Sequence, residues 1–316
     1  MATDKINNTP DVSVVMPVYN GERYLEEVLD AVFGQKTGFM FEVIVIDSGS
    51  SDRSIEIISK YPVRLHQIPN EEFGHGKTRN LGVRLAAGKY IVFLTQDATP
   101  ASPYWLDNLV GVLEKDAEVA GAYSRQLPRP DCNPLERRDI LLGTPPISNI
   151  RKVDFGDDFQ RLTYEDHWHR FMVFSDVSSC VRKDIFERLP FNEEILMVED
   201  QEWCKRAIES GYAVVYMAAS PVYHSHNHSL KETYKRYLDY GRSFREFTDY
   251  KVTFKNVLFY ALHESLLDCT FVMKQRNNII WKIKHLVCSP LVRFAMRYGL
   301  HKGLNRRGLA GQGKGE

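Results

Sequence analysis

Short apolar runs alternate with segments of helical periodicity between residues 12 and 123, and this alternation restricts the fold class more than any other feature. The apolar runs predict strands at residues 12–16, 43–46, 63–68, 90–94 and 119–123, and Pro17 is expected to end the first one. Apolar residues spaced three and four apart predict helices at residues 22–33, 54–60, 77–87 and 103–114. Alternating strands and helices with short connections indicate an α/β fold: a mostly parallel, doubly wound sheet with helices on both faces.

The second half of the chain is less regular. Prolines are frequent in residues 127–174, where we expect an irregular connection with a few helices. Strand, helix and strand patterns then follow at residues 177–181, 202–210 and 212–217. After Ser229 the chain is predicted to be helical, which divides it into an α/β domain at residues 1–228 and a helical, basic C-terminal region at residues 229–316.

The composition excludes several classes of protein. Lysine plus arginine equals aspartate plus glutamate, at 41 each, so the net charge gives no indication of a nucleic-acid partner. The five cysteines are scattered without a CxxC pair, which is typical of a reducing cytosol. Neither GxGxxG nor GxxxxGK[ST] follows the first strand, so dinucleotide-binding and P-loop proteins are both disfavoured. We find no secretory signal and no run of about 18 apolar residues, so we expect a cytoplasmic protein or one that meets a membrane only at its surface.

Acidic residues follow two of the predicted strands. Asp47 comes directly after the strand at residues 43–46, and Asp97 follows the strand at residues 90–94. Ligands of open α/β sheets bind beyond the carboxyl ends of strands. Asp47 could therefore accept hydrogen bonds from a base or a ribose, and Asp97 could bind a divalent cation. Each acid could instead cap the turn or helix that follows it.

A glycine-rich loop leads into the helix predicted at residues 77–87. Residues 75–80 place Lys77 and Arg79 near its first turn, where free backbone N–H groups and the helix dipole favour an anion. An arginine can also hold a phosphate through two N–H groups. The same segment could be an ordinary solvated basic turn.

Glu199 and Asp200 come just before the helix predicted at residues 202–210. Acids suit the start of a helix, and they could have no further role. The apolar approach at residues 191–198 could bury Asp200, and a carboxylate held near a cleft could take a proton from a hydroxyl nucleophile.

Two histidines follow the last predicted strand. His224 and His226 are two residues apart on an extended segment, so their side chains face the same side. One of them could complete the ligand set of a cation beside Asp97. The alternative is a pair of surface histidines.

The chain from residue 278 onward mixes basic and apolar residues. It holds eight lysines and arginines against one acid, Glu316, with Trp281 and many aliphatic residues between them. This pattern favours an interfacial helix on an anionic membrane surface. A basic helix packed on the body of the protein or on a second subunit would show the same composition.

These segments together resemble glycosyltransferase family 2, whose members have the GT-A fold. The matching motifs lie at residues 12–21, 42–52, 78–82, the strand into Asp97, and Glu199-Asp200. Three segments are most similar to the bacterial rhamnosyltransferase branch: residues 73–80 (FGHGKTRN), 93–98 (FLTQDA) and 222–227 (VYHSHN). The family often has Asp-x-Asp after the fourth strand, and here Thr95 stands at the first position, as it does in that branch.

The resemblance implies an inverting transferase that moves L-rhamnose from dTDP-β-L-rhamnose to a growing cell-surface glycan on a polyprenyl-diphosphate lipid. It implies that Asp200 is the general base. It implies that a divalent cation, Mg²⁺ or Mn²⁺, is bound by Asp97, His224 and His226. It assigns the nucleotide-sugar, with its nucleobase at Asp47, to Pro17, Tyr19, Asp47, His75, Arg79, Asn80, Gln96, Asp97 and Glu199. It places the enzyme on the inner face of the cytoplasmic membrane, attached through the C-terminal region, with no nucleic-acid partner.

Other functions stay open at this point. A family 2 transferase that uses a UDP-hexose donor, such as UDP-glucose, would share the same motifs. A non-catalytic scaffold on a membrane surface would keep the fold without the chemistry, although the retained Asp97, Asp200 and His224 argue against it. A homo-oligomer formed through the C-terminal helices is a further alternative to membrane attachment.

Overall fold

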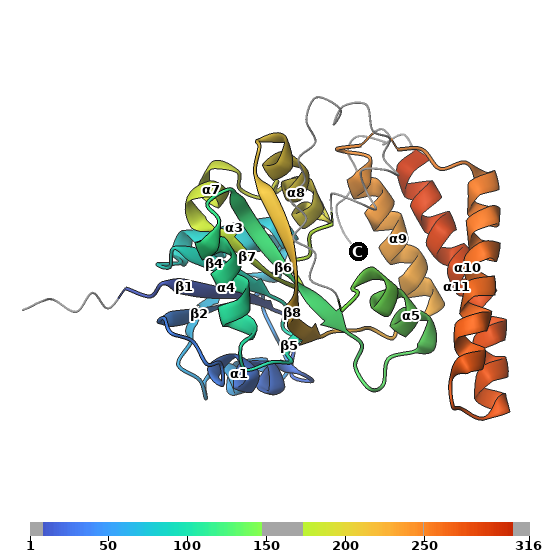
Figure 1. Cartoon of the computed structure of the whole chain (residues 1–316), viewed down its shortest axis with the longest axis horizontal. Helices are drawn as coiled ribbons and strands as arrows, with labels where there is room; N and C mark the ends of the chain where they lie inside the picture. Colours follow the sequence, from blue (N-terminus) through green and yellow to red (C-terminus); the bar gives the residue numbers. More distant parts are fainter. Residues whose placement is uncertain (1–8, 147–172, 249, 306–316) are drawn as a thin grey trace, which may run out of the picture. The chain divides into compact units, whose positions relative to one another are not determined.

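The computed structural model describes residues 9–146, 173–248 and 250–305 (Figure 1). These residues divide into two compact units. The first takes the described parts of residues 1–132, 139–194 and 199–225, and the second takes 133–138, 195–198 and 226–316. One division falls between residues 225 and 226, and the boundary after residue 228 stays a prediction. Most of the irregular connection expected at residues 127–174 lies outside the described residues, and its described part holds α5 (Pro134–Gly143).

The first unit is built on one sheet of eight strands, in the order β3-β2-β1-β4-β7-β6-β8-β5. The strands are β1 (Val12–Val18), β2 (Phe41–Asp47), β3 (Arg64–Gln67), β4 (Tyr90–Leu94), β5 (Thr99–Pro100), β6 (Val119–Leu127), β7 (Ser178–Arg182) and β8 (Ala213–Tyr223). Strands β3, β2, β1 and β4 are neighbours in that order and run parallel to one another, and β6 runs parallel to β8. Strand β7 is antiparallel to β4 and β6, and β5 is antiparallel to β8, so the expected α/β sheet is mixed on this side.

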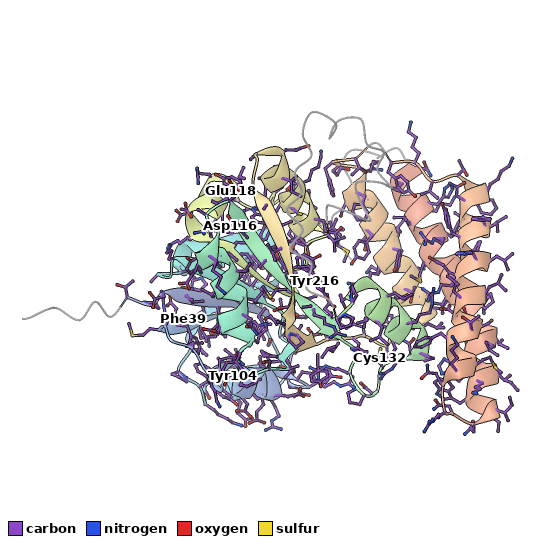
Figure 2. The ribbon with its side chains drawn as sticks, viewed as in Figure 1. Phe39, Tyr104, Asp116, Glu118, Cys132 and Tyr216 are labelled. Carbon is purple, nitrogen blue, oxygen red and sulfur yellow. The ribbon has the colours of Figure 1, made fainter. Side chains whose placement is uncertain are left out.

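Helices cover both faces of this sheet, as the alternating sequence predicted (Figure 1). They are α1 (Leu25–Phe33), α2 (Ser54–Ile58), α3 (His75–Leu85), α4 (Trp105–Lys115), α7 (Lys183–Arg188) and α8 (Glu199–Glu209), with a 3₁₀ turn η1 (Asn70–Glu72). Side chains of a strand alternate between its two faces. Val14 of β1 therefore packs in the core that contains α1, α2 and α4, whereas Val15 packs in the core that contains α3, α7 and α8. In the second core, Tyr216 of β8 (labelled in Figure 2) packs on Tyr123, with ring centroids 5.3 Å apart.

Pro17 does not end β1, in contrast to the expectation. The strand continues to Val18, and Pro17 is paired in register with Ile46 of β2. Successive residues of a parallel strand bond to opposite neighbours, and the Val18 carbonyl accepts from Ser48 on the β2 side. Pro17 therefore faces the β4 side, where pairing has already stopped at Val15, so its missing N–H removes no ladder bond.

The second unit contains three long helices that pack side by side: α9 (Leu230–Phe244), α10 (Phe254–Lys274) and α11 (Ile279–Asn305) (Figure 1). A capping box begins α9, with Ser229 and Glu232 each accepting the other's backbone N–H. Glycines let α9 and α11 approach closely, because a Cβ on Gly303 would lie 2.3 Å from the Leu238 carbonyl oxygen. No helix in the described part of the chain is both long and apolar enough to cross a membrane.

Candidate active site

The carboxyl ends of the parallel strands bring the predicted strand-end residues to one edge of the sheet. Val18, the last residue of β1, is in register with Asp47, the last residue of β2. On the other side of β1, Val15 is in register with Phe93 of β4, which is followed by residues 95–97. The chain segments after β1, β2 and β4 therefore leave the sheet together, as expected for a ligand site of an α/β protein.

Asp47 is fully buried, and its two carboxylate oxygens have different surroundings. Its Oδ2 accepts hydrogen bonds from the backbone N–H groups of Gly49 and Ser50, at 3.0 and 3.1 Å. Gly49 has a φ of +85°, which lets the turn bring these groups to the carboxylate. Its Oδ1 has no hydrogen-bond partner among the described residues. A buried acceptor of this kind can receive an N–H group from a ligand.

Gln96 ties the end of β4 to the end of β1. Its Oε1 accepts the backbone N–H of Tyr19 at 2.8 Å, and its Nε2 donates to the Tyr19 carbonyl at 3.0 Å. Gly21 leaves room for this amide, since a Cβ there would lie 2.6 Å from Gln96 Oε1. The Gln96 amide is thus bonded to the protein, while the Tyr19 side chain is exposed.

Asp97 lies beside the histidine segment after β8. Its Oδ1 is 3.7 Å from Nε2 of His224, and Nδ1 of His224 is 3.0 Å from Gln126 Oε1. With Nδ1 protonated toward this amide oxygen, Nε2 is left as a lone-pair donor. The ligand atoms of Asp97, His224 and His226 all lie within 4.8 Å of one another. One carboxylate and two imidazoles can hold a divalent cation, and the imidazoles suit Mn²⁺ better than Mg²⁺, which prefers an all-oxygen shell.

Arg129 contacts the backbone of Asp97, a role that no motif in the sequence indicated. Its Nη2 donates to the Asp97 carbonyl at 2.8 Å and to Thr99 Oγ1 at 2.7 Å. The guanidinium also lies over the ring of Tyr24, 3.8 Å from the centroid, and pairs with Glu27. These contacts orient the backbone that carries the Asp97 carboxylate.

Arg79 is buried in α3 and bonded to acids of the protein. Its Nη1 donates to Glu199 Oε1 at 2.7 Å, and its Nε is 3.6 Å from Oδ2 of Asp176. In this structure two carboxylates of the protein therefore surround the Arg79 guanidinium, and its contact with the nucleotide stays a prediction. Asp176 was not identified from the sequence, where it stands in no motif and precedes an ordinary strand pattern.

Asn80 and His75 lie on the same helix, α3. The Asn80 side chain donates to the Phe191 carbonyl at 2.9 Å and accepts the Phe191 N–H at 3.1 Å, so it too is bonded to the protein. His75 lies in the first turn, and its carbonyl accepts from Arg79 at 3.2 Å. Gly74, the residue before α3, has no side chain with which to cap the helix, and the start of α3 is a candidate anion site.

Asp200 lies in the first turn of α8 and is partly buried. Its Oδ2 accepts the backbone N–H of Asp176 at 3.1 Å, and its Oδ1 accepts the N–H of Gln201 at 2.8 Å. Burial raises the pKa of Asp200 well above its ordinary value, and the neighbouring Asp176 and Glu199 carboxylates raise it further. Burial also raises the pKa of Asp176 to about 7. Raised values of this kind are typical of a carboxylate that accepts protons near neutral pH.

The acidic cluster and the Asp97 segment are directly connected. The N–H of Thr95 donates to the Val177 carbonyl at 3.0 Å, and Val177 follows Asp176 in the chain. Ser178 of β7 is also in register with Leu94 of β4. Asp97 with His224 and Asp200 with Asp176 therefore stand at the same edge of the same sheet.

Comparisons with known proteins agree with this arrangement. Residues 13–179 match the family model described as glycosyl transferase family 2. The chain is 33% identical over 235 residues to the O-antigen chain rhamnosyltransferase RfbN of Salmonella typhimurium, covering 73% of this chain and 71% of that protein. It is 32% identical over 237 residues to the O-antigen chain rhamnosyltransferase WbaN of Salmonella anatum, with 73% and 71% covered.

Among solved structures, the mannosyltransferase PcManGT from Pyrobaculum calidifontis in complex with GDP-Man and Mn²⁺ is similar, with a TM-score of 0.57. The match covers 93% of this chain and 86% of that one at 18% sequence identity, so it shows the GT-A fold alone. The family match extends over more than half of the chain. This protein therefore belongs to glycosyltransferase family 2 and is a glycosyltransferase with the GT-A fold.

Proposed function

We propose that this glycosyltransferase transfers L-rhamnose from dTDP-β-L-rhamnose, with inversion, to a hydroxyl group of a lipid-linked cell-surface glycan. The observation that carries the proposal is the similarity, over 73% of the chain, to a protein named as an O-antigen chain rhamnosyltransferase. A second protein named in the same way is similar over the same share of the chain. The Thr95-Gln96-Asp97 form of the strand-end motif supports the same branch.

Asp47 is proposed to bind the nucleobase. The imide N–H of thymine or uracil needs one acceptor, and the free Oδ1 of Asp47 supplies it. An Asp47→Asn variant retains an oxygen for the turn, but it presents an NH₂ group where Oδ1 now lies. We expect dTDP to bind at least about tenfold more weakly to this variant, because two donors would face each other.

Asp200 is proposed to act as the general base in a single displacement. The acceptor hydroxyl attacks the anomeric carbon from the face opposite the nucleotide, and its proton passes to the Asp200 carboxylate. The bond between the anomeric carbon and the diphosphate oxygen breaks as the new glycosidic bond forms. A base of this kind contributes about 10²–10⁴ in rate, so Asp200→Asn should lose that much turnover and keep its affinity for dTDP.

Asp97, His224 and His226 are proposed to hold the divalent cation, Mn²⁺ or Mg²⁺. When bound, such a cation offsets the negative charge that develops on a diphosphate leaving group. The protein's part is to present Nε2 of His224 toward Asp97, which the Gln126 amide does from the other side of the ring. In calorimetry, dTDP should bind the wild type more tightly with Mn²⁺ than without it, and Asp97→Asn should lose this difference.

The donor is tested by product analysis with the whole chain of 316 residues. We expect transfer from dTDP-β-L-rhamnose to a polyprenyl-diphosphate glycan, detected by NMR of the product, and a larger rise in melting temperature with dTDP than with UDP. Asp200→Asn is the control for contaminating activity. Transfer from UDP-glucose or UDP-galactose in preference would replace the rhamnosyl proposal with the UDP-hexose alternative. Absence of transfer and of donor hydrolysis would support the scaffold instead.

The second unit is proposed to attach the enzyme to an anionic lipid surface on the inner face of the cytoplasmic membrane. Large apolar side chains recur at helical spacing on α10 and α11 and are more than half exposed: Leu258, Phe259, Leu262, Leu266, Met273, Ile279, Ile280, Ile283, Val287 and Leu291. Ile280 is 77% exposed. We call these residues the apolar stripe. Soluble monomers rarely leave so many large apolar residues together in water.

Exposed cations near the stripe favour lipid over a second subunit as its partner. Three exposed cations lie near the turn between these helices: Lys274 ends α10, Arg276 lies in the turn, and Lys284 lies in the second turn of α11. Two other cations of the tail, Arg293 and Arg297, are instead paired with Asp268 and Glu264 of α10. Arg306, Arg307 and Lys314 lie outside the described residues.

Flotation with vesicles that contain phosphatidylglycerol tests the attachment. The wild type should float, and a double variant, Leu262→Ser with Ile280→Ser, should stay in the dense fraction. Leu142→Ser is the matched control, since Leu142 is an exposed leucine of α5 outside the apolar stripe. A double variant that still floats would overturn the proposal. Light scattering that shows a wild-type dimer and a variant monomer would assign the stripe to a second subunit.

A further inference from the structure

We propose that Asp176 is a positioning residue for the reaction: its backbone holds the Asp200 carboxylate, and its own carboxylate sets the pH range in which Asp200 works. The inference rests on Asp200 being the base proposed above. Asp176 belongs to none of the motifs that identify the family in this sequence. Its assignment comes from the contacts of the folded chain alone.

Two backbone N–H groups hold the Asp200 carboxylate in place. The backbone N–H of Asp176 donates to Asp200 Oδ2 at 3.1 Å, while the other oxygen of Asp200 accepts from Gln201. A carboxylate held by two backbone N–H groups has a fixed orientation, which a base needs if it is to meet the acceptor hydroxyl. The position of Asp176 therefore determines where the proton acceptor lies.

Asp176 is itself held on several sides. Its Oδ1 accepts from the Ser179 hydroxyl at 2.7 Å, and its Oδ2 faces Arg79. The next residue, Val177, accepts at its carbonyl from both the N–H and the hydroxyl of Thr95, at 3.0 and 3.4 Å. Thr95 stands where an acid is common in the family. An aspartate at position 95 would place a carboxylate against the Val177 carbonyl oxygen, so two acceptors would face each other. Threonine donates to this carbonyl instead and is therefore compatible with the observed position of Asp176.

Asp176 and Asp200 also interact through their charges. Among the described residues, the charged or ionisable groups that face Asp200 are Asp176 before β7, Glu199 and Cys204 on its own helix, and Arg79 on α3. Burial raises the pKa of the Cys204 thiol, so this group stays neutral. One guanidinium then faces three carboxyl groups, and Glu199 is its closest partner at 2.7 Å. Asp176 and Asp200 cannot both ionise easily, so they titrate as a coupled pair.

The pH dependence of kcat/KM tests this role, because its acidic limb reports the ionisation of the base in the free enzyme. Asp176→Asn keeps the backbone N–H and the shape of the side chain but removes its charge. With the like charge gone, Asp200 should ionise more easily, and the acidic limb should move to lower pH by about one unit. Turnover at pH 8 should fall by less than about tenfold, since a weaker base remains in place.

Two further variants complete the experiment. Asp176→Glu keeps the charge and should leave the acidic limb at its wild-type pH. Ser179→Ala removes a donor that favours the ionised form of Asp176, so the shared proton should move toward Asp176 and the limb should shift to lower pH by a smaller amount. Asp107→Asn, at an exposed acid of α4, is the control and should leave the profile unchanged.

Failure of this inference differs from failure of the proposed base. If Asp200→Asn retains near-normal turnover, Asp200 is not the base and the inference falls with it. If Asp200→Asn is inactive but Asp176→Asn and Ser179→Ala only lower the rate, with limbs at the wild-type pH, the role of Asp176 in setting the pH range is refuted. If Asp176→Asn does not fold, the limb position of Ser179→Ala decides the matter alone.

Discussion

The buried carboxyl group of Asp176 should make the folded protein less stable as the pH rises, and the Asp176→Asn variant should remove this loss. The pKa of Asp176 is about 7 in the folded protein, against an ordinary value of 3.8, chiefly because of burial. The folded state therefore keeps a proton that the unfolded chain releases. The resulting stabilisation is complete below about pH 4 and is lost as the pH rises through about 7.

The size of the effect follows from the same two values. The difference between about 7 and 3.8 is roughly 3 pH units, and each unit corresponds to about 1.36 kcal/mol, which gives an upper bound of about 4 kcal/mol. Because Asp176 shares its titration with Asp200, we expect about 2–4 kcal/mol. Below about pH 4 the two proteins should be nearly equal in stability, since Asp176 is then neutral in both the folded and the unfolded wild type, and at pH 5 the wild type should already have lost roughly 1–2 kcal/mol of the stabilisation. At pH 8 Asp176→Asn should be the more stable one.

Urea unfolding at pH 5, 6.5 and 8 measures this difference. Subtracting the free energy of unfolding of the wild type from that of Asp176→Asn cancels the titration of groups that do not interact with Asp176, and the coupled titration of Asp200 stays within the expected range of about 2–4 kcal/mol. The difference should grow with pH for Asp176→Asn, and it should stay within about 0.5 kcal/mol of zero for the exposed control Asp107→Asn. A difference for Asp176→Asn that is independent of pH would refute the reasoning, since Asp176 would then ionise alike in the folded and unfolded chains.

Two further predictions concern helix packing and the cation site. Gly303→Ala should lower the melting temperature and reduce the free energy of unfolding by about 1–3 kcal/mol or more, because its Cβ would lie 2.3 Å from the Leu238 carbonyl oxygen. Gly38→Ala is the control: a Cβ at Gly38 would have no atom within 4 Å, so this variant should unfold at nearly the wild-type temperature. Arg129→Lys should reduce the Mn²⁺-dependent part of dTDP affinity several-fold in calorimetry, because lysine cannot reproduce the planar donor that reaches the Asp97 carbonyl; an unchanged Mn²⁺ effect would show that Arg129 does not position Asp97.

The local pattern of apolar residues was sufficient to predict most strands of the sheet. The strand predicted at residues 90–94 is β4 at the same residues, because five consecutive buried side chains leave little choice of structure. Helices on both faces were also predicted, since a strand flanked by two cores must be apolar throughout. The direction of β7 was not predictable, because it depends on the path of the chain before it, and neither composition nor periodicity records that path.

The partners of Arg79 and Asn80 show a different limit. The sequence predicts that Arg79 lies near the start of a helix, where a phosphate is a reasonable partner for its side chain. In the folded chain, Arg79 bonds to Glu199, 120 residues away, and Asn80 bonds to the backbone of Phe191, 111 residues away. A buried charge requires a counter-charge wherever the fold brings one, so the partner is a property of the tertiary structure. Both side chains therefore bind parts of the protein, Glu199 and the backbone of Phe191, that lie within ten residues of Asp200 in the chain.

The two roles considered for Asp47, capping a turn and accepting a hydrogen bond from a ligand, use different carboxylate oxygens and are compatible. As a turn cap it uses only Oδ2, which accepts from Gly49 and Ser50. As a ligand acceptor it would use only Oδ1, which faces no partner among the described residues. The turn therefore fixes the carboxylate at the sheet edge before any ligand arrives, and this rigidity lowers the entropy cost of binding. An Asp47→Ala variant would lose both roles together, whereas Asp47→Asn changes mainly the second, so only the asparagine variant separates nucleotide recognition from the stability of the turn.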